Sequence, residues 1–176
     1  LEYLINDLIQ LASLGNPGFA IKKTRIDLPG LLEKTSRRFN AALQHRKIRL
    51  VTDAGGVGIL AADEARLVQA LDNLVANALR HACEDSNLRI IARQEESRVI
   101  LEVANSGPRI PEEDLTRLFD PFFRSGTDRS RSTGGSGLGL SIVREIMHLH
   151  GGSCRIENLP DGVCVRLELP ALTTRE

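Results

Sequence analysis

The sequence predicts an α+β fold, a two-layer α/β sandwich in which helices cover one face of a mixed, mostly antiparallel sheet. Segments with apolar residues at helical spacing alternate along the chain with shorter, strand-like segments. Several strand-like segments follow one another across short turns, which is typical of antiparallel hairpins. The chain has 176 residues, 41% of them hydrophobic, enough for one main domain with a core of its own.

The first half of the chain carries three helical patterns. Residues 1–14 have an apolar stripe at helical spacing that stops at the turn 15–18. The stripe begins without a capping residue, so we expect it to be the end of a longer helix from a larger protein. Asp63 is placed to cap a helix from Glu64 to about Cys83. The other predicted elements of this half are a short strand at 26–28, a helix at 29–46, and strands at 48–52 and 57–61.

The second half predicts two hairpins separated by loops and a helix. Residues 88–93 and 98–103 alternate well enough to pair as neighbouring strands, and 153–157 and 163–169 pair across a Pro-Asp-Gly turn. Between the hairpins we expect a turn-rich loop at 105–111, a short helix at 112–118, a polar mobile loop at 124–136 and a helix at 138–150.

Composition excludes several classes of protein. Lys plus Arg and Asp plus Glu both total 23, so no net charge favours nucleic acid, and we expect no nucleic-acid partner. Three cysteines without CxxC spacing predict packing residues in a reducing compartment rather than disulfides or a zinc site. No apolar run approaches the roughly 20 residues that a membrane helix needs. We therefore expect this chain to be soluble and cytoplasmic.

Two asparagines stand out on the predicted helix 64–83. Asn73 and Asn77 lie one turn apart on one face, where an apolar stripe would not place them. An amide oxygen can bind Mg²⁺, which takes its other ligands from water and substrate phosphates. Arg80 and His81, one turn further on, could reach the same phosphates. The alternative is that the two amides are ordinary buried polar groups with their hydrogen bonds satisfied.

A glycine-rich turn runs directly into the helix predicted from Leu138. Gly135, Gly137 and Gly139 permit close backbone approach, and the N-terminus of the helix favours an anion. Glycines at a tight loop entry are the alternative explanation. The spacing does not match the dinucleotide fingerprint GxGxxG, which follows a strand, because a long polar loop precedes it here.

Two further segments lie between these elements. The turn at 105–111 holds Asn105, whose amide could read the amino edge of an adenine, although a plain turn explains it as well. Three of the five phenylalanines, Phe119, Phe122 and Phe123, cluster beside the polar loop. They could anchor a hinge or form a stacking platform for a base.

In this order, the segments resemble the ATP-binding domain of sensor histidine kinases, within the GHKL superfamily that also includes gyrase, mismatch-repair and heat-shock chaperone ATPases. The resemblance covers about residues 26–170. The N box of that domain resembles residues 63–81, its G1 box 105–111, its F box 119–124 and its G2 box 135–140. Residues 1–15 resemble the second helix of the preceding dimerisation and phosphotransfer domain, which makes 16–25 a linker and 171–176 a tail.

The resemblance implies a role for each motif in an ATP site. Asn77 would coordinate the Mg²⁺ that bridges the phosphates, with Asn73 in support. Asn105 would bind the adenine, and residues 124–134 would form the lid over the nucleotide. The remaining residues assigned to ATP binding by the resemblance are Arg80, His81, Gly107, Ile110, Phe122, Arg124, Gly135, Gly137, Leu138, Gly139 and Leu140.

Three positions depart from the family or from its hydrolytic members. Asn105 stands where the family usually has Asp, although some metal-responsive sensor kinases also have Asn there. Arg109 stands where the family usually has a second Gly. Asn can accept from the adenine amino group as Asp does and can also donate, so binding should survive. Asn73 stands where hydrolytic relatives have a glutamate that activates water, and an amide cannot act as a general base. We therefore expect phosphoryl transfer rather than fast hydrolysis.

The implied activity is that of a protein-histidine kinase whose γ-phosphoryl acceptor lies elsewhere. None of the four histidines is followed by the sequence of the family's receiving site. The implied partners are ATP, the protein's own histidine-bearing dimerisation domain in a homodimer, and the aspartate of a response regulator. The intact protein would be anchored in the bacterial inner membrane. The main alternative is a nucleotide-gated interaction module that transfers no phosphate; Asn73 disfavours a gyrase-type ATPase.

Overall fold

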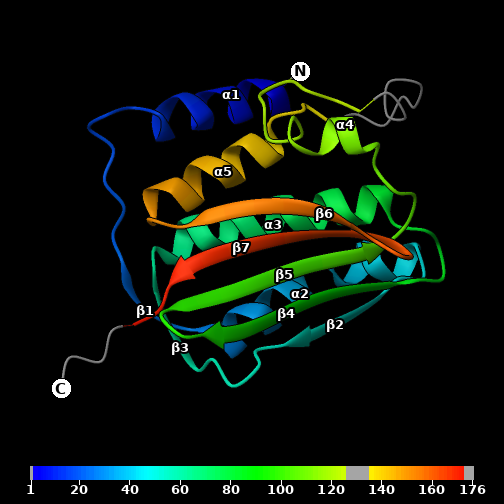
Figure 1. Ribbon diagram of the computed structural model, residues 1–176, viewed down its shortest axis with the longest axis horizontal. Helices are drawn as coiled ribbons and strands as arrows, with labels where there is room; N and C mark the ends of the chain where they lie inside the picture. Colours follow the sequence, from blue (N-terminus) through cyan, green and yellow to red (C-terminus); the bar gives the residue numbers. More distant parts are fainter. Residues whose placement is uncertain (1, 126–134, 173–176) are drawn as a thin grey trace.

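The structure, a computed structural model that describes residues 2–125 and 135–172, confirms the α+β sandwich (Figure 1). Its main sheet has five strands in the order β2-β4-β5-β7-β6. Residues 126–134, most of the predicted lid, lie outside the described residues. The elements are α1 (Glu2–Leu14), β1 (Thr24–Asp27), α2 (Leu28–His45), β2 (Arg49–Asp53), β3 (Ile59–Ala62), α3 (Glu64–His81), β4 (Asn87–Glu95), β5 (Arg98–Ser106), α4 (Glu112–Leu115), α5 (Gly139–Leu149), β6 (Ser153–Leu159) and β7 (Gly162–Pro170).

Both predicted hairpins are present, and they meet in the middle of the sheet. β4 pairs with β5 and β6 with β7, and β5 and β7 join the two hairpins, all in antiparallel register. Only β2 runs parallel to its neighbour, β4, among the strands of this sheet. β1 and β3 pair with each other instead, in a separate two-stranded sheet that the sequence did not predict.

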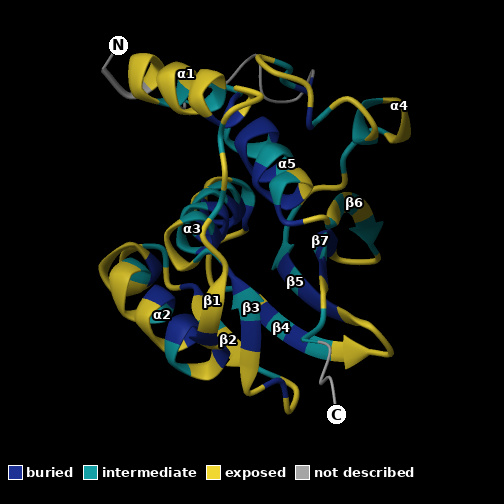
Figure 2. Cartoon of the chain, turned by 90° about the vertical axis from the view of Figure 1, so that its left-hand side faces the viewer, coloured by how far each residue is buried: buried dark blue, intermediate teal, exposed yellow. Residues whose placement is uncertain are grey.

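The hydrophobic core fills the space between the five-stranded sheet and α2, α3 and α5 (Figure 2). Alternate residues of β4, Leu88, Ile90 and Ala92, are fully buried against the helices. On α3 the residues at helical spacing, among them Leu67 and Leu71, are fully buried as well. The apolar residues that recur every second position thus form the sheet layer of the core, and those that recur about every 3.6 positions form the helix layer.

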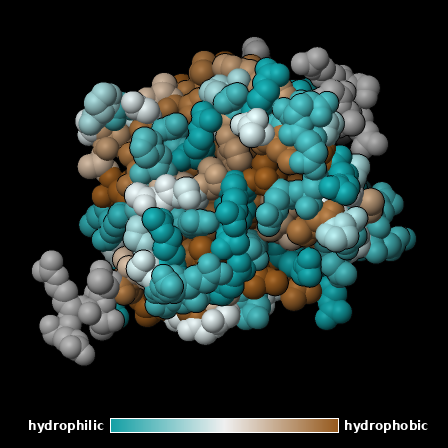
Figure 3. Space-filling model, viewed as in Figure 1, coloured by the Kyte–Doolittle hydropathy of each residue, from teal (hydrophilic) through white to brown (hydrophobic). Residues whose placement is uncertain are grey.

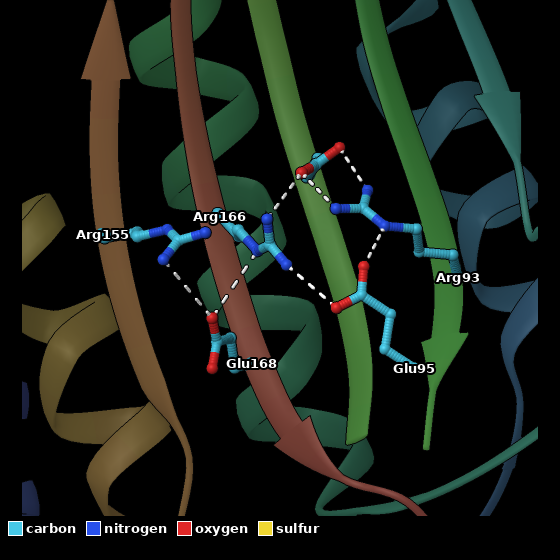
Figure 4. A network of polar contacts seen from close by, with 6 residues as sticks. Arg93, Glu95, Arg155, Arg166 and Glu168 are labelled. Atoms are coloured by element: carbon cyan, nitrogen blue, oxygen red, sulfur yellow. Dashed lines mark hydrogen bonds and ion pairs between the residues drawn. The ribbon is translucent and has the colours of Figure 1, made fainter. Parts of the chain in front are cut away.

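The opposite face of the sheet carries charged side chains that pair with one another, and this face is largely hydrophilic (Figure 3). Arg93 donates two hydrogen bonds to Glu102, at 2.6 and 3.0 Å, and one to Glu95 at 2.6 Å. Arg166 lies 3.2 Å from Glu95 and 3.6 Å from Glu168 (Figure 4). The hydrogen bond from Arg93 lowers the pKa of Glu102. An antiparallel sheet with this pairing can leave one face to water.

Both ends of α3, the helix that carries the two asparagines, are held by side chains. Asp63 caps its start as predicted, accepting a hydrogen bond from the backbone N–H of Arg66 at 3.1 Å. At its end the guanidinium of Arg46 donates to the carbonyl oxygens of Leu79 and, at 2.8 Å, Ala82. A cation at a helix C-terminus also complements the helix dipole. These contacts fix the position of the helix at the site.

His150 joins the end of α5 to the start of α3. Its Nε2 accepts a hydrogen bond from the backbone N–H of Asp63 at 3.0 Å, and its Nδ1 lies 2.7 Å from the carbonyl oxygen of Ile146. Nδ1 must therefore be protonated and Nε2 free to accept, which is the neutral imidazole. Burial lowers the pKa of His150. Lys23 donates to its carbonyl oxygen at 2.9 Å, so the segment before β1 is held at the same place.

α1 packs mainly against α5 (Figure 1). Asp7 accepts a hydrogen bond from the hydroxyl of Ser136 at 2.6 Å, and Gln10 accepts one from Gln69 at 2.5 Å. In the described part of the chain no helix is both long and apolar enough to cross a membrane.

One predicted helix is shorter than the sequence suggested. Residues 112–118 were expected to be helical, but α4 ends at Leu115. Beyond it the backbone N–H of Arg117 bonds to Asp114 and that of Asp120 to Arg117, so the segment continues as turns. These turns bring Phe119 into the core, where it is 7% exposed.

Candidate functional site

A cavity of about 1060 Å³ opens between α3, the start of α5 and the ends of β5, β6 and β7. Its floor is formed by apolar residues of the three strands, Val103, Ile156 and Val165. Twelve of the fourteen residues predicted to bind ATP line it; Gly107 and Leu138 do not. Segments from residue 73 to residue 140 are therefore brought together around one space. The resemblance to an ATP site thus corresponds to a real cavity.

Asn73 and Asn77 lie on the wall that α3 forms. Both side chains are half-buried and line the cavity, and neither amide has a hydrogen-bond partner among the described residues. The alternative of satisfied amides would therefore require hydrogen bonds to water. Asn73 also lies at the start of α5, since a methyl group added to Gly139 would be 3.8 Å from its Oδ1. The two amides are thus open to a ligand that enters the cavity.

The glycine-rich turn forms the opposite wall. Gly137 has a φ of +72°, and its carbonyl oxygen accepts the backbone N–H of Phe122 at 3.0 Å. The first intrahelical bond of α5 runs from the N–H of Ile142 to the carbonyl oxygen of Leu138. The N–H groups of 139–141 therefore have no acceptor within the helix. Gly139 and Leu140 line the cavity, so this free, partly positive helix end faces it.

Leu138 does not line the cavity, and its side chain is fully buried in the hydrophobic core. Its backbone N–H donates to the hydroxyl of Ser136 at 3.2 Å. Ser136 in turn donates to Asp7, so a carboxylate of α1 lies at the entry of α5. Leu4 and Asp7 also line the cavity. The sequence pattern gave no signal for this contact between α1 and the glycine-rich turn.

The loop after β5 lies at the other end of the cavity. The amide of Asn105 donates to the carbonyl oxygen of Ser106 at 3.3 Å, and its side chain lines the cavity. Gly107 packs against the end of α3, where an added methyl group would be only 2.6 Å from the carbonyl oxygen of His81. Arg109 lies at the rim, with its guanidinium 3.5 Å from Glu112. The loop that follows β5 thus packs against the C-terminal end of α3.

The three clustered phenylalanines have different environments. Phe119 is buried in the core. Phe122 is 57% exposed, lines the cavity and has a φ of +64°. The guanidinium of Arg117 lies 4.4 Å from the ring centre of Phe123. Arg124 follows and also lines the cavity.

Asn158, on β6, was not among the predicted residues. Its amide makes two hydrogen bonds to the backbone of Ile110, at 2.9 Å and 2.8 Å. A polar residue at the end of a predicted strand gives no sign of such a role. The floor residues, by contrast, could have been predicted from the alternation along the strands.

Outside the cavity, Glu102, Glu157 and Cys164 bring one ligand atom each to within 4.8 Å of one another. Glu102 is already bound by Arg93. Burial raises the pKa of the Cys164 thiol to about 11, so at neutral pH it is not the thiolate that a metal requires. We assign no metal to this group. Cys154 and Cys164 pack in the interior, whereas Cys83 is exposed and not the packing residue that we expected.

A family model and two related proteins, found by comparison with known sequences, agree with one another. The family model described as "Histidine kinase-, DNA gyrase B-, and HSP90-like ATPase" matches residues 62–173. The sensor protein CzcS of Cupriavidus metallidurans is 34% identical over 162 residues, which are 92% of this chain and 34% of that protein. The signal transduction histidine-protein kinase BaeS of Escherichia coli is 34% identical over 97% of this chain and 37% of its own length. The chain thus spans about a third of the length of these relatives.

Solved structures agree with the sequence comparison. The catalytic domain of histidine kinase ThkA has a TM-score of 0.78 and 32% identity, covering 86% of this chain and 97% of that one. Full-length ShkA in complex with AMPPNP has a TM-score of 0.86 and 27% identity, covering 98% and 36%. ThkA in complex with the response regulator TrrA has a TM-score of 0.80 and 27% identity, covering 99% and 48%.

Proposed function

Because the chain belongs to the family of histidine kinase-, DNA gyrase B- and HSP90-like ATPases, we propose that its cavity binds Mg²⁺-ATP for transfer of the γ-phosphoryl group to a histidine. The observation that carries the proposal is the pair of walls around the cavity. On one side stand two amides without partners, Asn73 and Asn77, and on the other the free N-terminus of α5. This arrangement suits a polyanion with its metal ion.

Each wall would hold a different part of the nucleotide. The backbone N–H groups at the start of α5 would bind phosphate oxygens, and Asn77, supported by Asn73, would bind the Mg²⁺ between α3 and the phosphates. Asn105 would bind the adenine at the other end of the cavity. Since phosphoryl transfer depends mainly on positioning and charge neutralisation, these groups are the kind that it needs.

The acceptor of the phosphoryl group would be a histidine outside this chain, on a dimerisation domain of the same protein. In this proposal α1 is the end of that domain, 16–25 the linker and 26–170 the ATP-binding domain. The phosphoryl group would then pass to the aspartate of a response regulator, and the whole kinase would be a homodimer at the inner membrane. Support comes from relatives that are named a sensor protein and a signal transduction histidine-protein kinase, and from the ThkA complex with a response regulator.

The test is a calorimetric titration of the chain with AMPPNP, with and without Mg²⁺. We expect binding in the micromolar range or tighter that strengthens when Mg²⁺ is present. Mixing the chain with a separately expressed histidine-bearing domain and γ-labelled ATP should then label that domain. A folded chain that does not bind AMPPNP would contradict the proposal.

The proposal also predicts little hydrolysis of ATP by the chain alone. Asn73 cannot take a proton from water, because an amide is not a general base. Fast release of phosphate would instead point to an ATPase of the gyrase or chaperone type. The comparisons give no support to the interaction-module alternative.

A further inference from the structure

We propose that Asn158 is a positioning residue that fixes the wall of the base pocket through the backbone of Ile110. This inference rests on the proposed function, because it takes the cavity to be a nucleotide site. Asn158 lies near the end of β6, directly opposite Val163 of β7. It belongs to none of the motifs around the cavity, yet its side chain reaches the loop that follows β5.

The amide of Asn158 binds both polar backbone groups of one residue. Its Oδ1 accepts the N–H of Ile110 at 2.9 Å, and its Nδ2 donates to the carbonyl oxygen of Ile110 at 2.8 Å. The second N–H of Nδ2 has an acceptor too, a carboxylate oxygen of Glu112 at 3.1 Å. All the donors of the side chain are therefore in use. Such a pair of bonds holds Ile110 as a neighbouring strand would hold it.

The loop has few other bonds that could hold it. Pro108 and Pro111 have no N–H to donate. Among the described residues, the backbone bonds nearest to Ile110 are those from Gly107 to Asp161 at 3.0 Å and from Asp114 to Pro111 at 2.9 Å. The first of these also comes from the β6–β7 hairpin. The turn of that hairpin packs closely on β5, since a methyl group on Gly162 would be 1.9 Å from the carbonyl oxygen of Asn105.

The position of the loop matters because its residues form the cavity wall next to Asn105. Pro108, Arg109 and Ile110 all line the cavity. Asn105 can select adenine only if the base is pressed against a wall at a fixed distance, and Asn158 sets where that wall lies. Losing the two hydrogen bonds between Asn158 and the backbone of Ile110 should therefore weaken nucleotide binding and reduce discrimination between bases, while leaving the fold in place.

The test compares Asn158→Ala with wild type by calorimetric titration with AMPPNP and by competition with GMPPNP. We expect AMPPNP to bind roughly tenfold more weakly, the size expected when hydrogen bonds that order a binding loop are lost, and the preference for AMPPNP over GMPPNP to fall. Hydrogen exchange at the amide of Ile110 should become faster, with Tm little changed. Asn40→Ala, on the exposed surface of α2, is the matched control and should change none of these.

A second variant, which places a charge at position 158, tests the hydrogen bonds to Ile110 specifically. Asn158→Asp keeps the shape and the acceptor for the N–H of Ile110 but places a carboxylate against two acceptors, the carbonyl oxygen of Ile110 and the carboxylate of Glu112. It should weaken AMPPNP binding more than Asn158→Ala does. Adding Glu112→Gln should restore part of the loss, because the glutamine can donate where the carboxylate could only repel.

The outcomes separate this inference from the proposed function. If wild type binds AMPPNP and Asn158→Ala binds it equally well with the same base preference, the inference is wrong. An equal loss for AMPPNP and GMPPNP together with a lower Tm would also overturn it, as the role would be purely structural. If wild type itself does not bind AMPPNP, the proposed function fails first. Should Asn158→Ala not fold, the Asn158→Asp pair with and without Glu112→Gln decides.

Discussion

Replacing Gly137 with alanine should reduce both stability and nucleotide affinity, because the backbone there is in a left-handed conformation that favours glycine. Gly137 has a φ of +72°. An alanine Cβ would lie 3.1 Å from both the Cα and the carbonyl carbon of Phe122, which are backbone atoms and cannot rotate away. At the same point the carbonyl oxygen of Gly137 accepts the N–H of Phe122 at 3.0 Å, so the two segments cannot separate without losing that bond.

The cost can be estimated from these two effects. A left-handed conformation costs an L-residue about 1–2 kcal/mol. A close backbone contact that must be relieved by a shift of the chain adds about 1 kcal/mol. The total of about 2–3 kcal/mol corresponds to a decrease in Tm of about 4–12 °C for a chain of this size. If the loop instead moves to relieve the strain, the same energy appears as AMPPNP binding weaker by about 30-fold to 150-fold.

Two neighbouring glycines provide matched controls for thermal unfolding. In Gly135→Ala the new Cβ would meet only the end of the Arg80 side chain, at 2.7 Å, and that side chain can move. In Gly139→Ala it would be 3.8 Å from Asn73, an ordinary contact, in the first turn of α5. Both should keep the Tm within about 2 °C of wild type. A Gly137→Ala variant that matches these controls in Tm and matches wild type in AMPPNP affinity would refute the reasoning.

Three other predictions follow from the site and from His150. Asn77→Ala should remove the strengthening of AMPPNP binding by Mg²⁺, because the amide oxygen on α3 is lost; a calorimetric Mg²⁺ effect equal to that of wild type would exclude the metal role. Asn105→Asp should still bind AMPPNP, since the carboxylate also accepts from adenine, and loss of binding would show that the base lies elsewhere. Burial lowers the pKa of His150 below its usual 6.5, so as the pH falls the imidazole is protonated more readily in the unfolded chain than in the folded one. The free energy of unfolding should therefore decrease as the pH drops below about 6.5. Urea unfolding should show this slope, at most about 1.4 kcal/mol per pH unit, in wild type and less in His150→Gln; equal slopes would contradict it.

The sequence determined the elements of this protein because their signals are local. The apolar spacing of α3 and its cap at Asp63 depend on residues within one turn of the helix, and both are present as predicted. Two asparagines on one face and a glycine turn before a helix are local patterns too, and their residues do line one cavity. The sequence determines the ends of elements less well, because turns compete with the last turn of a helix. The predicted helix 112–118, for example, ends at Leu115 in α4.

The tertiary structure alone decided which distant groups meet. Asn158 is 48 residues away from Ile110, and Asp7 is 129 residues away from Ser136, yet each pair is joined by hydrogen bonds of 2.6–2.9 Å. The separate pairing of β1 with β3 was likewise set by packing and not by either strand alone. A residue's own neighbours determine whether it is helical, extended or capped. Which far segment supplies its hydrogen-bond partner depends on how all the layers pack, and the local pattern carries no record of that.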